Sequence, residues 1–148
     1  FTQKVNWKDL DFIIVDMPPG TGDTQLTFSQ EIKMDGAIIV STPQEVALLD
    51  VKRGIKMFDK LGVKILGLVD NMSYFIGDDG KKYKIFGEGG VKRTAEEFNK
   101  EFLGEITIDP KVGKAADEGK PIVELDPENE ISKIYIDLAN KVKTEFIK

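Results

Sequence analysis

The sequence lacks cysteine and histidine altogether. Their absence excludes disulfide bonds, thiol chemistry and the usual nitrogen or sulfur ligands of a metal site within these 148 residues. Carboxylate sites for a hard cation such as Mg²⁺ stay open. No apolar run approaches the ~20 residues that a membrane helix needs, so we expect no membrane-spanning segment.

A basic surface is also missing. The chain has 21 basic and 26 acidic residues, a net charge of −5, and its lysines and arginines are spread along the sequence. This balance argues against nucleic acid or an anionic membrane as a partner. With 41% hydrophobic residues, the chain is long enough for one core of ordinary domain size. Because it starts with Phe1 rather than Met, we expect it to begin inside a longer natural chain.

Short apolar runs alternate with helical patterns, which predicts an α/β fold with a mainly parallel sheet and helices on both faces. Strands are expected at residues 12–15, 36–41, 63–69 and 102–108. The first three consist largely of β-branched and other apolar residues, so both faces of each should be buried.

The helix signals are clearest after the second strand. Thr42 and Glu45 have the spacing of a capping box, and Gly62 is a plausible stop. A last helix should open at Asp126-Pro127, with shorter helices at 91–100 and from Asp109-Pro110. Residues 74–76 and 83–86 could pair as a hairpin around the turn at 77–80.

The most informative segment, residues 13–23, reads IIVDMPPGTGD. A buried strand would deliver Asp16 at its carboxyl end, where ligands bind in open α/β sheets. A carboxylate there can hold Mg²⁺, usually through water, beside nucleotide phosphates. Gly20 lets the backbone come close to a phosphate. The alternative interpretation is a strand followed by a proline and glycine turn, with Asp16 as a cap.

The string D-x-P-P-G-T-G-D resembles the Walker B and switch II segment of the Mrp/ApbC family of MinD-like P-loop ATPases. Further strings resemble those of the family and follow in its order. They are STPQEVALLD at 41–50, NMSYF at 71–75, FGEGG at 86–90, LGEI at 103–106 and DEGKP at 117–121. The resemblance extends from about Trp7 to Val123 and departs from the family at Asp70, where Glu is usual, and at Thr107, where Pro is usual.

The resemblance implies a MinD-like P-loop NTPase fold without its N-terminal part, so that residues 1–148 form the C-terminal part of a single ATPase domain. The implied activity is that of an ATP-binding and ATP-hydrolysing iron–sulfur cluster carrier or assembly protein. Such a protein would use ATP and Mg²⁺, work as a homodimer in the cytoplasm, and serve iron–sulfur client proteins.

Four residues match functional positions of the family. Asp16 matches the Walker B acid near Mg²⁺, and Gly20 the glycine whose N–H faces the γ-phosphate, so both are candidate catalytic residues. Asn71 matches the asparagine that reads adenine, and Asp109 lies near the loop that lines adenine and ribose. The residues themselves leave other roles open, because Asn71 could cap a turn and Asp109 could cap the helix that starts at Pro110.

Two departures bear on function. The phosphate-binding loop with its lysines and the first switch are absent from this sequence, so we expect the chain alone to be inactive as an ATPase. Relatives carry two cysteines in a C-P-x-C string, and these positions fall on Gly77 and Gly80 here. Iron–sulfur clusters need such soft ligands, so the implied cluster has no ligands at these two positions.

Three functions therefore remain in competition. The first is the iron–sulfur cluster carrier, favoured by the strings NMSYF, FGEGG and LGEI. The second is a MinD-like regulatory ATPase that switches a dimer without carrying a cluster, favoured by the missing cysteine pair. The third is a non-enzymatic α/β scaffold. An assay of the intact protein for iron and sulfide separates the first two, and an ATPase assay separates both from the third.

Overall fold

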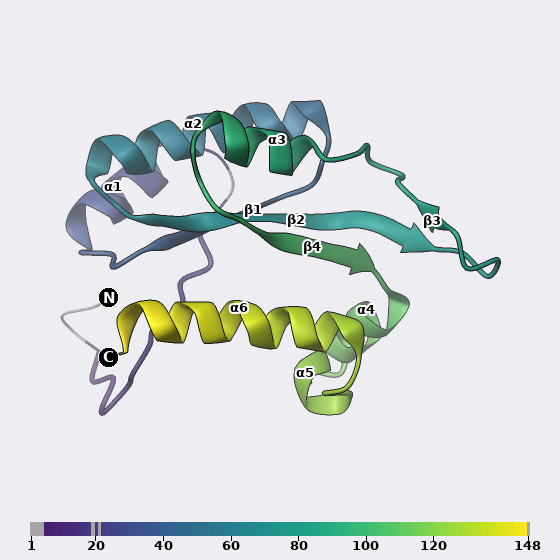
Figure 1. Cartoon of the computed structure of the whole chain (residues 1–148). Helices are drawn as coiled ribbons and strands as arrows, with labels where there is room; N and C mark the ends of the chain where they lie inside the picture. Colours follow the sequence, from purple (N-terminus) through teal and green to yellow (C-terminus); the bar gives the residue numbers. More distant parts are fainter. Residues whose placement is uncertain (1–4, 19, 21, 148) are drawn as a thin grey trace.

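The computed structural model describes residues 5–18, 20 and 22–147. Their strands form one sheet, in which β2 (Ile65–Ile76) is central. It pairs in parallel with β1 (Ala37–Ser41) on one side and β4 (Phe102–Ile108) on the other. Near its carboxyl end β2 also pairs antiparallel with the short β3 (Lys82–Tyr83). The predicted hairpin is thus confirmed, although its second strand is 82–83 rather than 83–86, and it extends beyond the helical layers (Figure 1).

Helices lie on both faces of this sheet (Figure 1). One face is covered by α2 (Glu45–Leu61) and α3 (Gly90–Glu97), and the other by α6 (Glu130–Phe146). The remaining helices are α1 (Asp23–Glu31), α4 (Pro110–Asp117) and α5 (Ile122–Leu125). The α/β class with a mainly parallel sheet is therefore confirmed. No helix in the described part of the chain is long and apolar enough to cross a membrane.

The core divides into two clusters because successive side chains of β2 point to opposite faces. Leu68 packs under α2 and α3, whereas Val69 packs under α6 and the α4–α5 segment. Both side chains are almost fully buried. The first cluster contains Leu48, Val51, Ile55, Ile65, Leu68, Val91 and Ala95, and the second contains Val69, Ile106, Ala115, Ile122 and Ile131.

Two predicted helix starts are wrong. Helix α2 begins at Glu45 with Gln44 as its N-cap and no side-chain capping bond, so Thr42 forms no capping box. Helix α6 begins at Glu130 rather than at Asp126, because Asn129 Oδ1 accepts a hydrogen bond from the Ile131 N–H at 2.8 Å. The predicted stop of α2 at Gly62 is confirmed by its left-handed conformation, with φ of 70°.

The first predicted strand is also wrong. Residues 12–15 form no strand, and their side chains are exposed, up to 82% at Ile14. The outer face of β1 is open as well, since Val40 is 57% exposed and Ile38 lies on the same face. Burial on both faces therefore holds for β2 only. The physical reason is that Val40 points to the same face as its aligned residue Val69, and the core cluster on that face contains no residue of β1.

The strings at 41–50 and 86–90 meet in space, which explains part of both motifs. A Cβ on Gly90 would lie 2.7 Å from the Pro43 carbonyl oxygen and 2.7 Å from Leu48 Cδ1. Gly87, with φ of +108°, approaches the same carbonyl oxygen. Glycine is therefore required for the first turn of α3 to lie directly on the connection between β1 and α2.

This contact predicts the effect of Gly90→Ala on stability. The added methyl group would force the Pro43 carbonyl and Leu48 apart, and we expect a loss of roughly 1–3 kcal/mol in the free energy of unfolding. Gly113→Ala in α4 is the matched control, because a Cβ there meets no atom within 4 Å. The control should gain about 0.5–1 kcal/mol. Urea unfolding of both variants measures the difference, and equal stabilities would contradict the packing argument.

Candidate functional site

The carboxyl ends of the parallel strands bring polar side chains to one edge of the sheet. Ser41, Asp70 and Glu105 are aligned across β1, β2 and β4. Asn71 follows in β2, is half-buried, and is aligned with Ile106 of β4. An amide at this edge can both donate to and accept from the edge of a base. The placement of Asn71 is thus compatible with the predicted adenine contact, which stays a prediction.

Asp109 follows the end of β4, three positions beyond the residue aligned with Asn71. Its Oδ1 accepts a hydrogen bond from the Lys111 N–H at 2.8 Å, and Pro110 occupies the first turn of α4. The alternative of an N-cap is therefore confirmed. A contact with a nucleotide is an additional role that no interaction of Asp109 in the structure tests.

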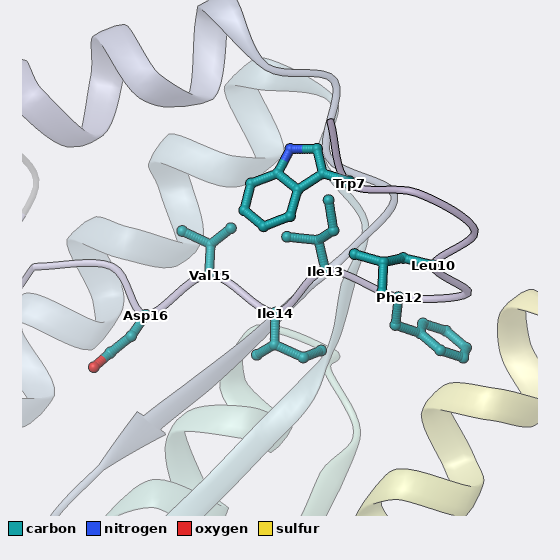
Figure 2. A pocket seen from close by; sticks show the side chains of 7 residues that line it. All are labelled: Trp7, Leu10, Phe12, Ile13, Ile14, Val15 and Asp16. Carbon is teal, nitrogen blue, oxygen red and sulfur yellow. The ribbon is translucent and has the colours of Figure 1, made fainter. Parts of the chain in front are cut away.

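Asp16 and Gly20 lie on the connection that leads into α1. Asp16 is exposed and ends an apolar segment that lines a pocket of about 420 Å³ (Figure 2). In that view Trp7, Ile13 and Val15 are on one side of the chain and Ile14 is on the other. The Asp16 carboxylate points away from these apolar side chains. The pocket suits apolar side chains, whereas the carboxylate is free to face a polar ligand.

The connection after Asp16 leads into the amino end of a helix. Gly20 has φ of +92°, and the Pro18 carbonyl accepts a hydrogen bond from Gln25 Nε2 at 3.0 Å. Gly22 caps α1 without any side-chain bond to the first-turn amides. Such amides are suited to bind an anion. The predicted residues Pro19 and Thr21 of this string lie outside the described residues.

The structure does not gather the four predicted residues into one closed site. Asn71 and Asp109 belong to the β2–β4 side of the sheet, and Asp16 and Gly20 belong to a connection that pairs with no strand among the described residues. No group of three or more metal-ligating side chains occurs in the described part of the chain. Mg²⁺ commonly uses only one or two carboxylates, with water and phosphate oxygens completing its shell. Exposed Asp16 fits that limited role.

Asp70 is the residue that sequence reasoning missed. Its side chain is 1% exposed, and its Oδ1 has no hydrogen-bond partner among the described residues. Burial is the main cause that raises the pKa of Asp70, the charge of Glu105 adds to it and Lys84 opposes both, and together they bring the pKa to about 6. The sequence did contain a signal for Asp70, because this ionisable residue directly follows the predicted buried strand at 63–69. Such residues are seldom fully buried without a partner, so an exception is a candidate functional residue.

Asp70 predicts a dependence of stability on pH. Its pKa is higher in the folded chain than the ordinary 3.8, so the neutral carboxyl favours the folded state. This contribution is complete below pH 3.8 and is lost as the pH rises through about 6. The loss has an upper limit of about 3 kcal/mol. Asp70→Asn removes the titration while nearly keeping the shape of the side chain.

The measurement is urea unfolding of both proteins between pH 4 and pH 7, a range that brackets about 6. The stability of the Asn variant relative to the wild type should increase with pH. Other carboxylates cancel in this difference because both proteins contain them. A difference that stays constant over the range would show that Asp70 does not titrate as described.

Comparisons with known proteins confirm the family resemblance of the sequence. Residues 1–143 match the ParA family described as NUBPL iron-transfer P-loop NTPase. An Arabidopsis thaliana mitochondrial iron–sulfur protein required for NADH dehydrogenase is 50% identical, over 95% of this chain and 45% of that protein. An iron–sulfur cluster carrier protein of Synechocystis is 46% identical, over 96% of this chain and 41% of that protein. The chain thus spans less than half the length of these curated relatives.

Solved structures show the same fold. A nucleotide-binding protein from Archaeoglobus fulgidus in complex with ADP is 41% identical, with a TM-score of 0.69 over 77% of this chain and 47% of that one. The cell division ATPase MinD of Pyrococcus furiosus is 24% identical, with a TM-score of 0.57 over 74% of this chain and 43% of that one, and supports the fold alone. On the match over residues 1–143 and these relatives, the chain belongs to the ParA family of NUBPL iron-transfer P-loop NTPases.

Proposed function

We propose that the chain is the C-terminal part of a single P-loop ATPase domain, and that the whole protein binds and hydrolyses ATP in the service of iron–sulfur protein assembly. The observation that carries this proposal is the segment at 13–23, in which exposed Asp16 is followed by a left-handed Gly20 and the uncapped amino end of α1. This arrangement offers one carboxylate for a metal and the amino end of a helix for a phosphate. The relative that binds ADP supports the same ligand class.

In this proposal each part of the site has a limited task. Asp16 orders Mg²⁺ through water, and Gly20 and the first amides of α1 face the terminal phosphate. Asn71 reads the adenine at the carboxyl end of β2, and Asp109 lies near the adenine and ribose while capping α4. Bound Mg²⁺ would supply charge stabilisation to the transferring phosphoryl group. The protein would work as a cytoplasmic homodimer. It would serve iron–sulfur client proteins, a role that the name of its Synechocystis relative, an iron–sulfur cluster carrier protein, supports.

A second function is favoured by a separate observation. The chain has no cysteine and no histidine, so its own side chains offer a cluster neither thiolate nor imidazole. A nucleotide-driven switch of a dimer, which regulates a partner without carrying a cluster, needs neither ligand. Iron and sulfide analysis of the intact protein, purified without oxygen, separates the two functions.

Asp16→Asn tests the nucleotide site in the full-length natural protein. Loss of the charge that orders the metal should lower Mg²⁺-dependent ATP hydrolysis by about 10–100-fold. Asp11→Asn is the matched control, because Asp11 is also an exposed carboxylate, five positions earlier in the same segment. Phosphate release by the two variants is compared at saturating ATP. If both hydrolyse ATP at the wild-type rate, Asp16 is not in the site.

The chain of 148 residues alone should bind ATP weakly. The sequence contains no phosphate-binding loop, so the amides and lysines that cradle the phosphates are absent from it. We expect a dissociation constant weaker than about 1 mM, equivalent to roughly −4 kcal/mol. Titration calorimetry with Mg²⁺ and ATP measures it. Micromolar affinity would mean that the residues described above form a complete site by themselves.

A further inference from the structure

The turn between β2 and β3 is closed by its own polar groups. The Gly77 N–H donates to the Lys81 carbonyl and the Gly80 N–H donates to the Gly77 carbonyl, both at 2.9 Å. At the tip, Asp79 Oδ1 accepts from the Lys81 N–H at 3.0 Å, and Asp79 Oδ2 accepts from the Tyr83 hydroxyl at 3.0 Å. The backbone bond from Lys81, followed by the bond from Tyr83, lowers the pKa of Asp79. Both carboxylate oxygens are therefore occupied.

The Tyr83–Asp79 contact, called the latch below, also fills the space beside Gly77. A Cβ on Gly77 would lie 2.7 Å from Tyr83 Cε2 and 2.9 Å from Asp79 Oδ1, closer than such atoms approach in proteins. Gly80 has φ of +73°, a conformation that strains any other residue. A side chain at position 77 therefore requires the Tyr83 ring and the Asp79 carboxylate to shift, which disturbs the bond between them, and one at position 80 is strained even though no atom lies within 4 Å of its Cβ.

These facts bear on the cluster that the relatives' names imply. An iron–sulfur cluster needs soft ligands, and the sequence has neither cysteine nor histidine. Carboxylates do not replace them, because no group of three or more metal-ligating side chains occurs within the residues that the structure describes. The residues present thus do not fit a cluster, at the hairpin or at another described position.

We infer that the β2–β3 hairpin is a latched structural turn, and that the latch excludes ligating side chains from position 77 independently of the missing thiols. Introducing two cysteines at positions 77 and 80 is then insufficient for efficient cluster binding, and Tyr83 must also be changed. The inference rests on membership of the carrier family but not on ATP hydrolysis, so it can fail or stand separately from the proposed nucleotide site.

The test compares Gly77→Cys/Gly80→Cys with the same pair combined with Tyr83→Ala. Each protein is incubated without oxygen with ferric iron, sulfide and glutathione, which supplies the remaining thiolates. Two ferric ions and two sulfides assemble with four thiolates, so no external reductant is needed. Iron retained per chain after desalting and the visible absorbance are measured. Breaking one hydrogen bond to a charged group costs free energy equivalent to about a tenfold change in a dissociation constant. The variant with Tyr83→Ala does not have to break this bond, so it should bind the cluster about tenfold more tightly than the double variant.

Controls separate the latch from folding and from non-specific iron. Gly77→Ser/Gly80→Ser/Tyr83→Ala has the same backbone changes without thiols and should retain no iron, like the wild type. A second triple variant, Gly77→Cys/Gly80→Cys/Asp79→Ala, removes the acceptor of the latch bond. It should bind the cluster as tightly as the cysteine variant that contains Tyr83→Ala. Circular dichroism melts establish that each protein is folded.

Three results would overturn the inference. The first is a wild-type cluster whose ligands map to the hairpin. The second is a double variant that binds as tightly as the two latch-opened variants, which would show that Tyr83 excludes nothing. The third is folded latch-opened variants that bind no iron, which would show that the turn lacks room for a cluster even without the latch. None of these outcomes depends on nucleotide, so the Asp16→Asn result stays an independent test.

Discussion

Burial of β2 on both faces is the constraint on which the rest of the structure depends. Leu68 and Val69 point to opposite sides and are each almost fully buried, so each face needs its own helical layer. The two layers in turn fix the crossovers that bring β1 and β4 to either side of β2. The polar edge at Ser41, Asp70 and Glu105 is a consequence of this parallel alignment. The burial of β2 therefore determines both the layers of the fold and the position of the candidate site.

The parts of this arrangement that follow from local pattern were predictable. Apolar runs predicted β2 and β4, and helical spacing predicted α2, because a strand or helix with such a pattern must bury it somewhere. Residues 12–15 have an equally apolar pattern yet form no strand, since pairing needs a neighbour and pattern alone cannot supply one. The capping box at Thr42 was also wrong, because α2 begins only at Glu45 with Gln44 as its N-cap.

The candidate site was predictable only where a motif carried it. Asp16, Gly20 and Asn71 came from strings that resemble a family, and the family itself is confirmed by the match over residues 1–143. The effect of the hairpin turn on position 77 could not be predicted from a motif. The sequence shows only that Gly77 and Gly80 stand where the resemblance implies cysteines, whereas the space taken by the Tyr83 ring is visible only in three dimensions. Asp70 was overlooked because its burial is a tertiary property.

The parallel pairing of β1 with β2 and of β2 with β4 also has a consequence for folding kinetics. Each pair is separated in sequence by a whole helical crossover, so neither ladder can form by a local hairpin. Loop-closure entropy must be overcome before such distant contacts become favourable. The sheet should consequently assemble late and more slowly than the sheet of a β-meander of the same length. Until it does, the apolar residues of β2 remain available to other unfolded chains.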